Sequence, residues 1–217
     1  VHYAGLGVPN GALTEFAARH SLKVIEDAAH AFPTVNEGTP VGAHGHAATV
    51  YSFYATKTMT TGEGGMVITP DEDLAARMRT MRLHGIDRDV FDRYSSTRPS
   101  WHYDVVAPGY KYNLTDTAAA MGRVQLRRAP EMVARRTTIA ARYDEAFRGL
   151  PVTLPARPAE GSTHAWHLYN LRLAADAPVS RDRFIALMAE AGVGTSVHFI
   201  PLHLQPYWRD TYGHAPE

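Results

Sequence analysis

Short apolar runs alternate with helical patterns through the first 85 residues, and this alternation constrains the fold more than any other feature. The run at residues 23–27 predicts a buried strand that ends in two carboxylates, and further strands are predicted at 47–53 and 66–69. Apolar residues at helical spacing predict helices at 11–20 and 70–84, the second with a capping box that starts at Thr69. Strands that alternate with helices predict an α/β domain with a mostly parallel sheet.

The second half predicts one long helix and then a second domain. The helix runs from about residue 115 to about 150 with a break or kink at Pro130, and the aperiodic stretch 86–108 before it predicts a long loop. Prolines cluster at 151–158, so we predict a large domain at 1–150 and a smaller α+β domain at 151–217. In the smaller domain we predict strands at 166–173 and 195–200 around a helix at 180–191 that Ser180 caps.

Composition excludes several classes of function. The 217 residues include 22 Lys+Arg and 22 Asp+Glu, so charge provides no reason to expect nucleic acid or an anionic membrane as a partner. Cysteine is absent, which excludes disulfides, zinc–thiolate sites and thiol nucleophiles. No apolar run approaches the roughly 18 residues of a membrane span, and no signal-peptide pattern opens the chain. We therefore expect a soluble, cytoplasmic protein, and we expect the chain to be a piece of a longer one because it begins and ends in mid-pattern.

Lys57 is the first candidate for chemistry. It follows a predicted buried strand directly and precedes a turn with glycines at 62, 64 and 65. An amine held beside apolar side chains loses hydration, which lowers its pKa and frees it to attack carbonyl groups. The alternative is an ordinary surface lysine where the strand ends.

Asp27 and Ser52 lie at the ends of predicted strands. Ligands bind α/β sheets at the carboxyl ends of the strands, so the Asp27 carboxylate is a candidate ligand-binding group, or else the N-cap of a helix that starts at residues 28–30. The Ser52 hydroxyl could bind a phosphate or satisfy the local backbone.

The twelve histidines offer pairs at 44/46, 164/167 and 198/203. Imidazole suits zinc, copper or iron, but no pair has the helical spacing with Glu between that marks zinc proteases. We predict no metal site, and a His-rich metal protein is kept as a rival interpretation.

Seven stretches together resemble the DegT/StrS-type sugar aminotransferases, fold-type I enzymes that use pyridoxal phosphate (PLP). They occur in the family's order at residues 25–31, 52–57, 60–66, 83–85, 109–116, 164–169 and 197–203. The resemblance implies a type I PLP-transferase large domain followed by a smaller domain. It also implies that about a hundred further residues, including the turn that holds the cofactor phosphate, belong ahead of this segment, so the segment alone is expected to be inactive.

The resemblance assigns cofactor roles to individual residues. Lys57 falls on the lysine that forms the Schiff base with PLP, and Asp27 falls on the carboxylate that pairs with the pyridine nitrogen. His30 takes the position near the ring hydroxyl, and Ser52 that of a phosphate ligand. Lys111 stands where many members have an Asn that reaches the cofactor phosphate of the partner subunit, which implies a homodimer with a shared active site.

The implied activity is transfer of an amino group from an amino acid, L-glutamate in this family, to a keto group of a nucleotide-linked sugar. Such enzymes serve amino-sugar and polysaccharide biosynthesis. Candidate substrate contacts are His84, Asn113, His164 and His167, each with a structural alternative. Two rivals remain: a non-catalytic member that binds PLP or a nucleotide sugar, and a PLP-dependent sugar dehydratase. The dehydratases carry His where this chain has Lys57, which favours the aminotransferase.

Overall fold

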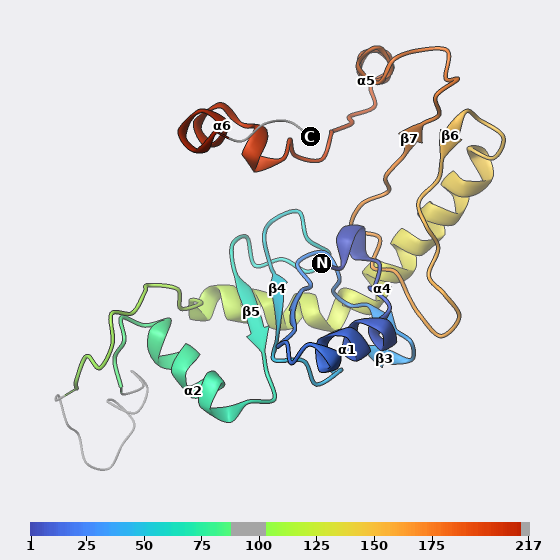
Figure 1. The fold of residues 1–217 in the computed structure, drawn as a ribbon. Coiled ribbons are helices and arrows are strands. Elements are labelled where there is room, and N and C mark those ends of the chain that lie inside the picture. The colour runs from blue at the N-terminus through green and yellow to red at the C-terminus, as the bar shows by residue number, and fades with distance from the viewer. Residues whose placement is uncertain (88–102, 214–217) are drawn as a thin grey trace. The chain divides into compact units, whose positions relative to one another are not determined.

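The computed structural model describes residues 1–87 and 103–213 (Figure 1). The chain folds into two compact units. The first unit comprises Val1–Arg148 with Leu154–Leu171, and the second comprises Gly149–Thr153 with Arg172–Glu217. The division into domains at 150/151 stays a prediction. Most of the predicted loop at 86–108 lies at 88–102, outside the described residues.

The first unit is built on a three-stranded sheet in the order β1-β4-β5. Strand β1 (Ile25–Asp27) pairs in parallel with β4 (Ala48–Ser52), and β4 pairs antiparallel with β5 (Gly65–Ile68). A separate antiparallel pair joins β2 (Val35–Asn36) to β3 (Thr39–Pro40). The prediction of a mostly parallel sheet is therefore wrong for the part of the sheet that the structure describes, which is mixed.

The connection between β4 and β5 explains the mixed sheet. A parallel connection needs a crossover of a dozen or more residues, usually a helix. Here the chain turns back, because Phe53 N–H donates to Gly64 O and Thr61 N–H donates to Phe53 O. Gly62 and Gly64 have φ of 80° and 152°, which glycine adopts without strain. The glycines mark the turn correctly, but a turn of this kind makes the next strand antiparallel.

Among the described residues of the first unit, three α-helices accompany the sheet. They are α1 (Asn10–Arg19), α2 (Glu72–Met81) and α4 (Asp116–Ala146). The predicted capping box at Thr69 is wrong, since Asp71 is the N-cap of α2 and its Oδ1 accepts from Leu74 N–H at 2.9 Å. Thr69 instead donates to the carbonyl of Ala47, which fastens the end of β5 to the segment before β4.

A break or kink was predicted at Pro130, and helix α4 does not break there but continues through it. Proline removes one backbone hydrogen bond from a helix interior. The turns on both sides remain packed, because Gly122, Ala129 and Ala140 are buried along one face. That packing, together with the cap that Thr115 provides, maintains the helix across the lost bond.

The core of the first unit lies around β4 and the segment that follows β1. Its buried apolar residues are Ala28, Ala31, Val41, Tyr51, Phe53 and Met59. Because these residues come from the strand ends and the adjoining turns, the core supports the edge of the sheet where parallel strands β1 and β4 both end.

The second unit contains β6 (Val152–Thr153) paired with β7 (Arg172–Leu173), then α5 (Arg181–Glu190), a 3-10 turn (Leu202–Leu204) and α6 (Pro206–Tyr212). The Ser180 cap is confirmed, since its hydroxyl accepts from Arg183 N–H.

Two strand predictions in this half are wrong. Of 166–173 only the last two residues form a strand, because they alone pair with another strand, and Trp166 has φ of 50°, outside the extended region. Residues 195–200 form no strand in the described structure, where their side chains are exposed and no other strand pairs with them.

Candidate active site

Asp27 and Lys57 come together at the edge where parallel strands β1 and β4 end. Asp27 is the last residue of β1, and Lys57 follows β4 in a turn in which its backbone N–H donates to Tyr54 O. The Asp27 side chain is exposed, and its Oδ1 accepts from the Ala29 N–H at 3.0 Å. This bond leaves the rest of the carboxylate available to another partner.

Electrostatics make Lys57 unusual for a lysine near a surface. Partial burial lowers the pKa of Lys57 below its ordinary value, while the Asp27 carboxylate acts in the opposite direction. A lowered pKa increases the fraction of neutral amine, the form that attacks a carbonyl carbon. The Asp27 carboxylate thus lies near enough to influence the charge of a partly desolvated amine.

Ser52 lies at the end of β4, where it pairs with Gly65 of β5. Its Oγ accepts from the Tyr54 N–H at 3.3 Å, a local bond that satisfies the backbone at the strand end. Ser52 is thus the last residue of β4, and Lys57 follows it by five residues.

His30 and His167 are in ring contact, with centroids 4.3 Å apart. The Nδ1 of His30 also accepts from the Ala4 N–H at 3.3 Å. His167 lines a cleft of about 380 Å³ between α4 and residues 166–169. The cleft is lined by Arg136, Ile139, Ala140, Tyr143, Trp166, His167 and Tyr169. His167 therefore connects this cleft to a residue predicted to lie beside the cofactor.

His164 lies in the interior of the first unit. It is 4% exposed, its ring stacks on Trp166 at 3.9 Å, and its Nδ1 accepts from the Trp166 N–H at 2.9 Å. Burial lowers the pKa of His164 to about 4, with a smaller contribution from the Arg157 guanidinium. A packing role accounts for each of these contacts, and the predicted substrate contact stays a prediction.

The buried His164 predicts how stability changes with pH. The unfolded chain binds a proton at a histidine below about pH 6.5, whereas the folded chain binds it at His164 only below about 4. The free energy of unfolding is therefore highest above pH 6.5 and falls by up to about 3 kcal/mol as the pH decreases to 4. Urea unfolding at about pH 7, 5.5 and 4.5 should show a weaker pH dependence in His164→Asn, which does not titrate. The exposed control His20→Asn should keep the wild-type dependence, and equal pH dependence in all three proteins would contradict the assignment.

His84 and Lys111 lie on two segments that are hydrogen-bonded to each other, one after helix α2 and one before helix α4. The N–H of His84 donates to Tyr110 O at 2.8 Å, and Leu83 forms a bridge with Lys111. His84 has φ of 59°, and the side chains of His84 and Lys111 are exposed, whereas Asn113 is half-buried. The structure thus brings His84 and Lys111, two of the predicted contact residues, onto neighbouring segments.

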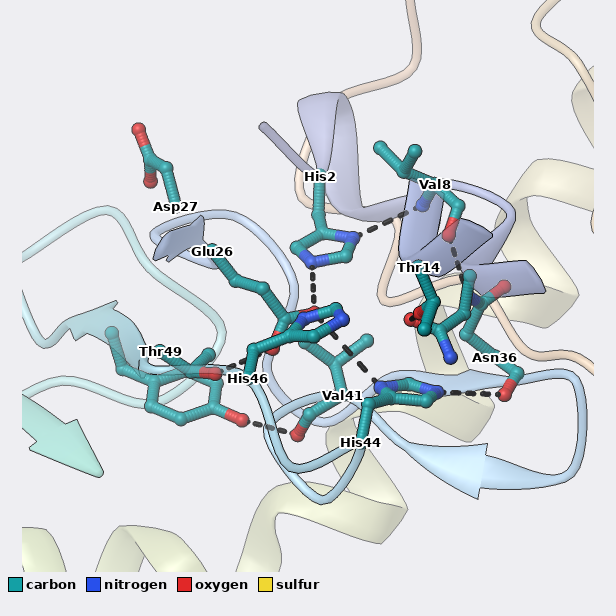
Figure 2. A network of polar contacts seen from close by, with 12 residues as sticks. His2, Val8, Thr14, Glu26, Asp27, Asn36, Val41, His44, His46 and Thr49 are labelled. Atoms are coloured by element: carbon teal, nitrogen blue, oxygen red, sulfur yellow. Dashed lines mark hydrogen bonds and ion pairs between the residues drawn. The ribbon is translucent and has the colours of Figure 1, made fainter. Parts of the chain in front are cut away.

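A buried cluster around Glu26 was not foreseen from the sequence. Its carboxylate accepts from Thr49 Oγ1 at 2.5 Å and lies 3.0 Å from His2 Nε2 and 3.3 Å from His46 Nδ1 (Figure 2). Burial alone would raise the pKa of Glu26, but the hydrogen bonds from Thr49 and His2 outweigh it and lower the pKa below its ordinary value. The sequence pattern that could have revealed the cluster is the alternation of side chains in a β-strand, which places Glu26 and Asp27 on opposite faces of the sheet. Figure 2 shows Asp27 directed away from the cluster.

Within 1–87 and 103–213, no three or more His, Asp or Glu side chains are arranged to hold a metal ion. Among the helices in these ranges, none combines the length and the apolar character that crossing a membrane requires.

Comparison with known proteins establishes the family. Residues 1–217 match the DegT/DnrJ/EryC1/StrS aminotransferase family throughout, and the chain belongs to it. Among curated relatives, the spore coat polysaccharide biosynthesis protein SpsC of Bacillus subtilis is 44% identical over 216 residues. The match covers 99% of this chain and 55% of SpsC, so the chain spans about half the length of this relative.

Solved aminotransferase structures share the fold of this chain. PseC of Helicobacter pylori, an aminotransferase involved in the biosynthesis of pseudoaminic acid, matches with a TM-score of 0.87 at 27% identity, over 100% of this chain and 56% of PseC. Spr1654 of Streptococcus pneumoniae in its PMP form matches with a TM-score of 0.86 at 30% identity, over 97% of this chain and 57% of Spr1654.

Proposed function

We propose that the full-length protein is a PLP-dependent aminotransferase that moves an amino group from an amino acid, L-glutamate in the first instance, to a keto group of a nucleotide-linked sugar. One observation carries the proposal: a lysine whose pKa is lowered lies beside a carboxylate where two parallel strands end. Family membership supports the reaction class, and SpsC supports a role in polysaccharide biosynthesis.

The residues at this edge suit PLP by their chemistry. When bound, PLP supplies an electron sink that stabilises negative charge on the amino-acid Cα. Lys57 would hold the cofactor covalently and move the proton, Asp27 would keep the pyridine nitrogen protonated, and Ser52 would bind the phosphate. His30, which follows β1 by three residues, would lie near the ring hydroxyl. Spr1654, whose fold this chain shares, has been solved in a PLP form.

Substrate and subunit contacts are part of the same proposal. Lys111, an exposed cation, would reach the cofactor phosphate of a partner subunit in a homodimer. His84, Asn113, His164 and His167 are the proposed substrate contacts, and the buried position of His164 makes it the weakest of the four. The cytoplasm is the proposed location.

Incubation with PLP, borohydride reduction and peptide mass analysis of the full-length protein test the first step. We expect a pyridoxyl group on Lys57 and on no other lysine. Addition of L-glutamate and a keto-sugar nucleotide should then yield 2-oxoglutarate and an amino sugar. Labelling without turnover on any keto-sugar nucleotide would favour the non-catalytic binding protein. A folded protein that is not labelled at Lys57 would overturn the aminotransferase.

A further inference from the structure

Two glycines meet where the segment after helix α2 crosses the segment before helix α4. A Cβ atom on Gly85 would overlap the carbonyl oxygen of Ala107 and lie 3.1 Å from the Gly109 nitrogen. A Cβ atom on Gly109 would overlap the Gly85 nitrogen and lie 2.5 Å from the carbonyl carbon of His84. Neither position has room for a side chain, so the two backbones touch each other directly at this crossing.

The turn at the crossing has a strained backbone that hydrogen bonds hold in place. His84 and Gly85 are consecutive residues with left-handed φ of 59° and 71°. Glycine adopts this conformation without cost, whereas a residue with a side chain does so only where its surroundings fix it. Here the His84 N–H donates to Tyr110 O at 2.8 Å, and the Val106 N–H donates to Gly85 O at 2.9 Å. Strain that is maintained in this way points to a function for the conformation.

The crossing lies next to Lys111, the residue proposed to reach a cofactor phosphate. The N–H groups of Tyr110 and Tyr112 donate to the carbonyl oxygens of Met81 and Arg82, at 2.7 and 2.8 Å. These carbonyl groups belong to the C-terminal end of α2, where a helix leaves its last acceptors without partners inside the helix. The end of α2 therefore holds the backbone on both sides of Lys111.

A side chain at residue 85 would disturb this arrangement at its nearest bond. It would push against Ala107 and Gly109, and Gly109 is joined directly to Tyr110. Backbone hydrogen bonds on either side of the crossing keep the two segments close, so the segments cannot separate there without losing one of these bonds. The displacement therefore reaches Tyr110, whose N–H holds one side of Lys111.

We propose that Gly85 is a positioning residue for the cofactor phosphate: it lets the two backbones cross with no side chain between them, and the crossing places the Lys111 ammonium group. The inference rests on the proposed function, in which Lys111 reaches the cofactor phosphate of a partner subunit. An ammonium group binds phosphate through charge-assisted hydrogen bonds, so displacement of Lys111 weakens the binding of PLP. Pyridoxal has the same ring and aldehyde but no phosphate, and its binding does not depend on Gly85.

The dissociation constants of PLP and of pyridoxal, measured on the full-length, cofactor-free protein, test the proposal. In Gly85→Ala we expect PLP to bind about tenfold more weakly, the loss of one hydrogen bond between charged groups, while the constant for pyridoxal changes by less than about twofold. Equal weakening of the two ligands shows general damage to the site and overturns the proposal. Unchanged binding of PLP by Gly85→Ala overturns it as well.

Gly38→Ala is the matched control, because it introduces the same backbone strain without the overlap. Glu37 and Gly38, in the turn between β2 and β3, are also consecutive residues with left-handed φ, of 50° and 79°. A Cβ atom on Gly38 would meet nothing within 4 Å, whereas one on Gly85 meets the other segment. The control should keep both wild-type constants, and a selective loss of PLP affinity in Gly38→Ala contradicts the role of the crossing.

Lys111→Met shows whether Gly85 acts through the ammonium group. This variant should lose about as much PLP affinity as Gly85→Ala and leave the affinity for pyridoxal unchanged. The double variant should bind PLP within about twofold of Lys111→Met alone, because the group that Gly85 positions is already absent. If the two losses multiply in the double variant, Gly85 acts on another group and the proposal fails.

A second variant and a measurement on the wild type keep the test decisive if Gly85→Ala does not fold. Gly109→Ala places its Cβ into the same contact from the opposite segment and at a residue without a positive φ, so we expect the same selective loss of PLP affinity. In the wild type, the amides of His84, Tyr110 and Tyr112 should be protected from hydrogen exchange. Exchange of these amides at the rates of an unfolded chain overturns the crossing itself.

Pyridoxyl labelling separates this inference from the proposed function. If Lys111→Met is labelled at Lys57 and binds PLP as tightly as the wild type does, the inference is overturned and the aminotransferase stands. If the folded wild type is not labelled at Lys57, the proposed function is overturned, and the positioning of a cofactor phosphate is overturned with it.

Discussion

Lys57→Ala should abolish amino transfer, with kcat reduced about a thousandfold or more. The lysine is proposed both to hold the cofactor covalently and to move the proton, and each role alone contributes orders of magnitude. The partly desolvated position next to Asp27 suits both roles, because burial lowers the pKa of Lys57. The measurement is the rate of 2-oxoglutarate formation from L-glutamate and a keto-sugar nucleotide by the full-length protein.

Lys23→Ala is the matched control for this substitution. Lys23 is exposed and lies just before β1, so its removal takes one ammonium group from the same unit without affecting the site. We expect the control to keep wild-type activity and wild-type pyridoxyl labelling of Lys57. Full transamination by a folded Lys57→Ala protein would remove the aminotransferase from consideration.

The meeting of Asp27 and Lys57 could be predicted from the sequence because it depends on local patterns. The apolar run before Asp27 indicates a strand that ends at a carboxylate, and Lys57 follows the next long apolar run directly. Parallel strands end at the same edge of a sheet, so these two patterns suffice to bring the residues together. The parallel pairing of β1 with β4 confirms that part of the fold.

Other features depend on contacts between distant segments, which a local pattern does not reveal. Residue 164 becomes interior because it forms a bridge with Leu6, at the other end of the sequence. The Glu26 cluster likewise needs His2 and His46 to converge on one carboxylate. Pro130 is a third example. The free-energy cost of a proline inside helix α4 is offset by the packing of the buried helix face, and the intrinsic helix propensity of the sequence does not include that packing.

Asp27→Asn should separate catalysis from attachment of the cofactor. The substitution preserves the shape of the side chain and the Oδ1 acceptor for the Ala29 N–H, and it removes only the charge proposed to keep the pyridine nitrogen protonated. We expect kcat to fall about a hundredfold to a thousandfold. Pyridoxyl labelling of Lys57 should persist, because loss of the Asp27 carboxylate lowers the pKa of the lysine further.

The control for Asp27→Asn is Asp71→Asn, which also replaces an exposed carboxylate that accepts a backbone N–H, in this case at the start of α2. Asparagine caps helices about as well as aspartate, so this variant should retain both its fold and its activity. The comparison therefore isolates the charge at residue 27 from the backbone contact that both aspartates make. If Asp27→Asn turned over as fast as Asp71→Asn, the carboxylate at the end of β1 would serve only to satisfy the Ala29 amide, and the pyridine nitrogen would need another partner. A variant that loses labelling together with activity would instead give Asp27 a role in binding the cofactor.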